Sequence, residues 1–114
     1  MTTLNKKYEL LTTDTKPHSG RTLYRIRALV SIGLSVVAGD LGGYIEKEGN
    51  LSHIGDAWVY GNAMVSGDAR VSGDAWVYGN AMVSGNAEVY GDAEVYGDAR
   101  VSGDAWVYGN AMVS

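Results

Sequence analysis

The chain has 114 residues, enough for one ordinary domain or for a small cap joined to a short solenoid. It contains no cysteine, which excludes disulfides and thiolate metal sites. The net charge of −4 is uneven: residues 1–50 hold seven basic and five acidic side chains, whereas residues 51–114 hold two and eight, so the second region is poorly suited to binding nucleic-acid phosphates.

The first residues do not have the pattern of a signal peptide. Lys6, Lys7 and Glu9 interrupt the apolar residues there, and no apolar run in the chain approaches the roughly 20 residues that span a membrane. We therefore expect a soluble cytoplasmic protein with no membrane partner.

The first 48 residues differ in pattern from the rest. Residues 8–12 and 23–30 are expected to be strands, and the turn-rich stretch between them, residues 13–20, contains the only proline. His18 lies in this stretch and is expected to be solvated. Residues 36–46 (VVAGDLGGYIE) bring three glycines just ahead of the repeats. We predict that residues 1–48 form a small β cap over the open edge of the domain that follows.

Residues 55–114 are ten uninterrupted hexapeptides of the pattern Gly-(Asp/Asn)-Ala-x-Val-(Tyr/Ser). Ala and Val are two residues apart, so in a strand they point to one side, while x and the Tyr or Ser point to the other. Gly-Asp and Gly-Asn are turn dipeptides that suit a corner. The pattern predicts a parallel β-helix over residues 49–114, with three hexapeptides to a coil. A degenerate first unit, residues 49–54, places Leu51 at the Ala position and His53 at the Val position, where we expect a hydrogen-bonded core histidine.

The repeats resemble the hexapeptide-repeat superfamily, because each valine from Val59 to Val107 is followed four positions later by an alanine. The resemblance implies an all-β fold, a left-handed parallel β-helix of triangular cross-section, and side-by-side homotrimers. The segments YRIRAL and AGDLGGYIE ahead of GDAWVYGNA repeats also resemble phage- or prophage-encoded hexapeptide proteins of uncharacterised function. A phage origin would place the protein in the host cytoplasm.

Outward residues 18 apart are expected to stack in columns, because three hexapeptides complete a coil. The three resulting faces are unequal, and one of them holds two of the three tryptophans. An aromatic strip of this kind exceeds what a soluble monomer normally exposes, which predicts a surface for self-association, with a trimer favoured, or for a protein partner. The predicted interface residues, on this face and a neighbouring one, are Trp58, Tyr60, Trp76, Tyr78, Tyr96, Trp106 and Tyr108.

Catalysis is the alternative that the superfamily suggests, since its acyltransferases use a histidine base and acyl-CoA. Only His18 and His53 are present, fewer than the three histidines of zinc carbonic anhydrases on this fold, and no loop interrupts the hexapeptides to shape a site. We therefore predict no catalytic residue, no cofactor and no metal site. The corner acids Asp56, Asp74 and Asp92 are expected to stack as solvated residues rather than as a calcium ladder.

The hypothesis that the sequence favours is a non-catalytic structural or binding protein of phage type, not an enzyme, in which a rigid acidic β-helix presents an aromatic face. The expected partner is a second copy, a virion component or a host factor that the protein inhibits, and not a nucleic acid. Two alternatives stay open: an acyl-CoA-dependent acyltransferase, and an inhibitor that mimics DNA through its stacked acids.

Overall fold

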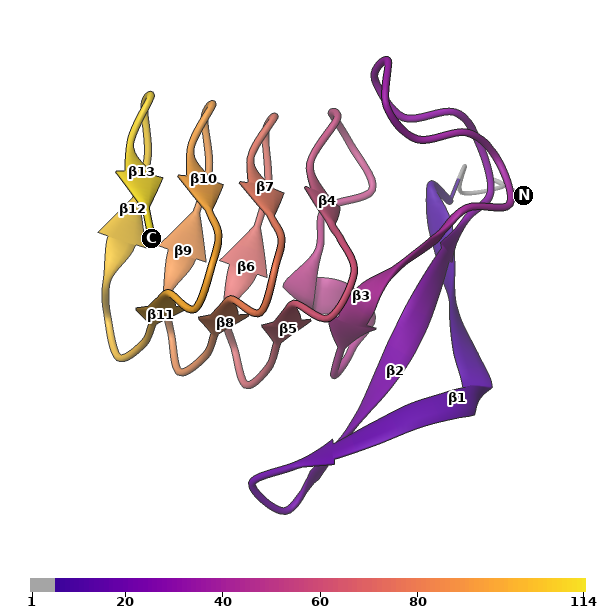
Figure 1. The fold of residues 1–114 in the computed structure, drawn as a ribbon, viewed down its shortest axis with the longest axis horizontal. Helices are drawn as coiled ribbons and strands as arrows, with labels where there is room; N and C mark the ends of the chain where they lie inside the picture. The colour runs from indigo at the N-terminus through magenta and orange to yellow at the C-terminus, as the bar shows by residue number, and fades with distance from the viewer. Residues whose placement is uncertain (1–5) are drawn as a thin grey trace, which may run out of the picture.

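A computed structural model of the chain describes residues 6–114. This part contains strands, one 3-10 turn, η1 (Glu48–Asn50), and no α-helix. A hairpin of β1 (Tyr8–His18) and β2 (Arg21–Ala28) lies at one end of a stack of coils, and β3 (Leu41–Ile45) joins the two (Figure 1). Nothing helical among residues 6–114 has the length and hydropathy to cross a membrane. The coils carry the two-residue strands β4 (Trp58–Val59), β5 (Met64–Val65), β6 (Arg70–Val71), β7 (Trp76–Val77), β8 (Met82–Val83), β9 (Glu88–Val89), β10 (Glu94–Val95), β11 (Arg100–Val101), β12 (Trp106–Val107) and β13 (Met112–Val113).

Three ladders of strands run along the stack (Figure 1). The first face consists of β4, β7, β10 and β13, in which Trp58, Trp76 and Glu94 are successive partners. The second face consists of β3, β5, β8 and β11, and the third of β6, β9 and β12. The repeat strands pair in parallel with partners 18 residues away, so the predicted parallel β-helix and its columns are confirmed, with about four coils.

The interior of the coils is filled by the small inward side chains. Every inward Ala and Val from Ala57 to Val101 is buried. The corner glycines have positive φ, a conformation that glycine adopts without strain. At Gly73 φ is 66°, and a Cβ would lie 2.9 Å from the backbone nitrogen of Gly91 in the next coil. The corner glycine is therefore needed both for the turn and for the close stacking of coils.

The hairpin is longer than the sequence pattern predicts. β1 continues through Pro17 to His18, and the turn is only Ser19 and Gly20, with φ of 50° and 78°. The predicted turn-rich stretch 13–20 is therefore wrong in extent, because β1 is an edge strand, where a proline is tolerated. A register shift between Leu11 and Thr15 accommodates the extra residues of β1.

β3 belongs to both parts of the molecule, since it pairs antiparallel with β2 and parallel with β5. The solenoid pairing thus begins within the residues 1–48 that were predicted as cap. Leu51 lies over Val71, 20 residues on, whereas the predicted register placed it over Ala69. This prediction is wrong because Val59 lies over Val77, only 18 residues on, so two extra residues stand between Leu51 and Val59. His53 lies in this longer connection and is not part of the core.

The hairpin closes the first coil with hydrogen-bond donors. Lys7, itself buried, donates through Nζ to the carbonyl oxygens of Ala57 (2.7 Å) and Gly55 (3.2 Å). The Tyr8 hydroxyl donates to the carbonyl oxygen of Leu51 (2.5 Å). Unpaired carbonyls at a sheet edge would be open to pairing with another chain, so these side chains protect that edge.

Candidate functional site

The predicted interface residues do not form one surface. Trp58 is 1% exposed and lies edge-on to Tyr8, with ring centroids 6.2 Å apart, so its prediction as a surface residue is wrong. The hairpin covers this coil, and a repeat pattern cannot show what packs beyond the end of the repeats. Trp106 and Tyr108 are exposed, but on the third face. The four remaining residues lie together on the first face: Tyr60, Trp76, Tyr78 and Tyr96.

The aromatic rings of the first face contact one another along the stack. Tyr60 meets Trp76 edge-on at 5.8 Å and Tyr78 at 6.4 Å, and Tyr78 stacks on Tyr96 at 5.4 Å with an interplanar angle of 12°. Such contacts hold the rings in place, so the row is a preformed apolar surface.

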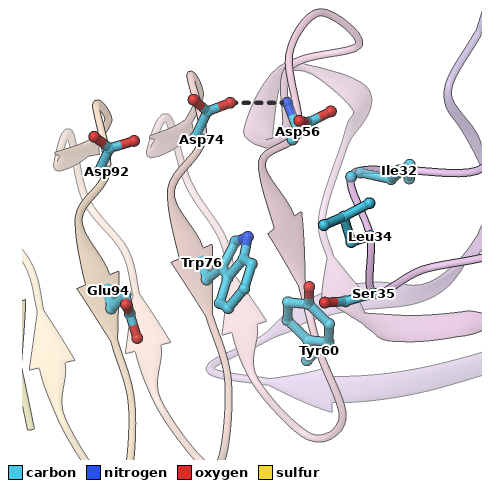
Figure 2. Close-up of a pocket in the computed structure, with 10 residues that line it drawn as sticks. Ile32, Leu34, Ser35, Asp56, Tyr60, Asp74, Trp76, Asp92 and Glu94 are labelled. Atoms are coloured by element: carbon cyan, nitrogen blue, oxygen red, sulfur yellow. Dashed lines mark hydrogen bonds between the residues drawn. The ribbon is translucent and has the colours of Figure 1, made fainter.

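A loop that sequence reasoning missed turns this face into a groove. Residues 29–40 connect β2 to β3, and within them Ile32 and Val36 form a two-way backbone bridge, with N···O distances of 2.8 and 3.2 Å. Their side chains are buried, whereas Leu34 at the tip is fully exposed. The only sequence signal for this turn is the pair of apolar residues flanking Gly33. This signal is too weak to predict that the loop forms one side of a groove. The groove has a volume of about 440 Å³ and is lined by Ile32, Gly33, Leu34, Ser35, Asp56, Tyr60, Asp74, Trp76, Asp92 and Glu94 (Figure 2).

One rim of the groove is acidic. Figure 2 shows Asp56, Asp74 and Asp92 in a row along one corner of the coils, with Trp76 below them and Leu34 on the side of the hairpin. The backbone N–H of Asp56 donates to Oδ1 of Asp74 at 3.4 Å, whereas the N–H of Asp74 donates to the Gly91 carbonyl oxygen at 2.9 Å. Within residues 6–114, no group of histidine, aspartate and glutamate side chains is arranged to hold a metal ion.

Glu94 adds a fourth carboxylate to the groove. The hydroxyl of Tyr78 donates to its Oε1 at 2.7 Å, and this hydrogen bond raises the pKa of Tyr78 to about 12. In the described part of the chain none of the four groove carboxylates has an ion-pair partner, and no basic residue lines the groove. The groove is thus an apolar floor beside carboxylates that form no ion pair among residues 6–114.

Five of the seven basic residues between residues 6 and 50 are, in contrast, paired with acids. Arg25 contacts Asp14 at 2.7 Å and Arg21 contacts Glu46 at 2.9 Å, and Arg27 pairs with Glu9. Two lysines pair likewise, Lys6 with Glu48 and Lys47 with Asp68. Most charges around the hairpin therefore have an opposite partner, while most of the acids on the coils are free of ion pairs among residues 6–114.

His53 is hydrogen-bonded, as predicted, but at the junction with the hairpin rather than in the core. Its ring stacks on Tyr8 at 4.2 Å. Nδ1 accepts the backbone N–H of Lys7 at 3.1 Å, so the proton is on Nε2, which faces Oε1 of Glu48 at 2.9 Å. Burial alone would raise the pKa of Glu48, but the hydrogen bonds from His53 and Lys6 outweigh it and lower that pKa.

His18 is half-buried at the end of β1 and not in the solvated loop predicted for it. It lines a smaller hollow of about 280 Å³ with Arg21 and the corner of the second coil. His53 lines a different hollow, with Arg70 and Glu88. The two histidines therefore do not contribute to a common site.

Comparison with known families agrees with the architecture. The YdcK beta solenoid repeat model matches residues 57–73, 65–78, 75–91 and 93–109. No curated protein matches the chain. Together with the stacked coils, the repeat matches support a repeat β-helix family.

Proposed function

We propose that this chain is a non-catalytic binding protein, in which the β-helix is a rigid support and the groove is the surface that receives a protein partner. The observation that carries the proposal is the fully exposed Leu34 facing a one-third exposed Trp76 across an acid-rimmed groove. A concave, mostly apolar site with a few charged groups is the usual form of a binding site.

The groove is held in shape by contacts that do not involve a ligand. Backbone hydrogen bonds tie the loop to β2, as from Gly39 N–H to the Ala28 carbonyl oxygen at 2.8 Å. The Asp40 carboxylate accepts the N–H of Val37 at 3.0 Å. The opposite wall consists of stacked coils. Such preorganisation favours binding, because little conformational entropy is lost when the partner docks.

The absence of catalysis is part of the proposal. His53 has both ring nitrogens engaged, one as acceptor and one as donor, so it has no lone pair for a base. The groove itself contains carboxylates and a serine but no histidine, cysteine or lysine beside them. This arrangement favours binding over the acyltransferase alternative, and we propose that no cofactor is needed.

A displayed library of random short peptides, selected on the immobilised protein, tests the proposed function. We expect peptides that bind the wild type and lose binding to the Leu34→Ser/Trp76→Ala variant. Trp106→Ala is the matched control, since Trp106 is an exposed tryptophan on another face. If no peptide is enriched, or if the enriched peptides bind the groove variant as well as they bind the wild type, the groove is not a binding surface.

The resemblance to the hexapeptide-repeat superfamily supports further proposals on handedness, origin and location. We propose, from the resemblance alone, that the coils are left-handed, that the chain is a phage-type member of the hexapeptide-repeat superfamily, and that it acts in the host cytoplasm. The competing proposal is that the first face mediates self-association into a homotrimer. Sedimentation equilibrium distinguishes the two, because a trimer held by this face would dissociate in the Trp76→Ala variant.

A further inference from the structure

Resting on the proposed function, we infer that the groove receives a segment of a partner protein in which an arginine stands next to an apolar residue. The groove offers two kinds of surface side by side. Asp56, Asp74 and Asp92 follow one another along its rim, and Tyr60 and Trp76 form its floor. The occupant should therefore combine a cation with apolar side chains.

Charge complementarity argues for the cation. The groove carboxylates lack ion-pair partners among residues 6–114, whereas basic side chains around the hairpin are paired with acids of their own. Lys7 lies behind this corner, but its ammonium binds the carbonyl oxygens of Gly55 and Ala57 and not a carboxylate. A cation supplied by a partner would lie against the acidic rim of the groove without displacing any ion pair formed within residues 6–114.

The protein itself shows which cation suits an aromatic ring beside a carboxylate. In the hairpin region Arg25 lies over the ring of Tyr44, with its Cζ 4.5 Å from the ring centroid. The same guanidinium binds Asp14 through Nε at 2.7 Å and the Tyr44 hydroxyl through Nη2 at 2.6 Å. The groove presents the same partners, Trp76 and Tyr60 next to Asp74, without the arginine. A planar guanidinium can stack and bind a carboxylate at once, which an ammonium does less well.

Size and shape argue for a peptide segment rather than a small cation. A volume of about 440 Å³ is far more than one guanidinium fills, and it is continuous with a second hollow of about 430 Å³ that shares Ser35, Tyr60 and Trp76 and extends to Tyr78. Within residues 6–114, the fully exposed side chain of Leu34 has no apolar partner on its outer side. An apolar side chain next to the arginine would cover Leu34 and Trp76 together.

Defined peptides and a pair of variants that remove the same number of charges test this inference. The probe is a short capped peptide in which arginine alternates with leucine, and its matched versions carry glutamate, lysine or, in place of leucine, serine. The groove variant is Asp74→Asn/Asp92→Asn. Asn stands at equivalent corners of other repeats, so this variant should fold as the wild type does. The control variant, Asp98→Asn/Asp104→Asn, removes the same charge from the other two corners.

We expect isothermal titration calorimetry to show binding of the arginine–leucine peptide to the wild type. The groove variant should weaken it about fivefold to tenfold, and the control variant less than about twofold, because only the groove acids contact the peptide. The serine version and the lysine version should bind more weakly.

Three results would overturn the inference while leaving the proposed function intact: equal binding of the glutamate version, equal weakening by the control variant, or library peptides that need the groove but lack arginine. If the arginine–leucine peptide does not bind and the library also yields nothing, the proposed function fails as well.

Discussion

Lys7 gives the sharpest test of how the hairpin closes the first coil. Its ammonium is buried against two backbone carbonyl groups, and this desolvation lowers its pKa from 10.5 to about 8, although the charges of Asp56 and Asp74 act in the opposite direction. Below about pH 8, Lys7 is charged in both the folded and the unfolded state, and the folded state carries the cost of the buried charge.

Between about pH 8 and about pH 10.5, the folded protein has a neutral Lys7 while the unfolded chain still binds the proton. Since the unfolded state then binds more protons, the free energy of unfolding rises with pH. The full shift corresponds to at most about 3 kcal/mol, and about 2 kcal/mol of it falls between pH 8 and pH 9.5. A neutral amine keeps two N–H donors, one for each carbonyl oxygen, so the contacts need not break.

Urea denaturation followed by circular dichroism, from about pH 7.5 to about pH 9.5, measures this effect. The range stops there because Tyr8, Tyr60 and Tyr78 have raised pKa values in the folded state, so tyrosines that ionise in the unfolded chain lower the stability above about pH 10. Lys7→Met should abolish the rise, and Lys6→Met, which changes an exposed lysine, should keep it. A flat wild-type profile, or a rise that persists in Lys7→Met, would refute the reasoning.

Two further predictions concern the stacking of the coils. Gly73→Ala should lower the free energy of unfolding by more than Gly97→Ala does. Both glycines have positive φ, so each substitution costs about 1 kcal/mol in backbone strain. Of the two, only the new Cβ at position 73 would also clash with the next coil, at Gly91. Equal losses in urea denaturation would contradict this role of the neighbouring coil. Trp58→Ala should cost about 3–5 kcal/mol and Trp106→Ala less than about 1 kcal/mol in the same assay, because the first ring is buried and the second is 64% exposed; comparable costs would show that the hairpin does not cover Trp58.

The candidate site was predictable only in part. The repeat pattern placed Tyr60, Trp76 and Tyr78 on one face and stacked the aspartates at its corner, and the strand register confirms these columns. The repeat pattern did not predict that the loop of residues 29–40 lies beside that face and forms a groove with it. Leu34 stands in a loop without periodicity, and its position depends on the bridge between Ile32 and Val36, which is a contact specific to the folded loop.

The position of His53 shows the same limit at the first coil. The hexapeptide register, extended backwards from Gly55, placed this side chain inside. Leu51 instead lies over Val71, 20 residues on, because two extra residues between Leu51 and Val59 interrupt the hexapeptide spacing. A register can be read from sequence only where the repeat is intact, since each corner and each inward pair is specified locally by its own residues.

The sequence by itself determined the regular β-helix, with its corners, its inward Ala and Val, its 18-residue coil and its columns. These follow from turn residues and from a strand's period of two, which act over a few residues. What only the tertiary structure decided is the environment of each column. The hexapeptide GDAWVY occurs at residues 55–60, 73–78 and 103–108, yet its tryptophan is 1%, 36% and 64% exposed, respectively. The three tryptophans differ because burial depends on what lies beside a coil, namely the hairpin over Trp58, the loop and its groove beside Trp76, and solvent around Trp106, and no local pattern contains that information.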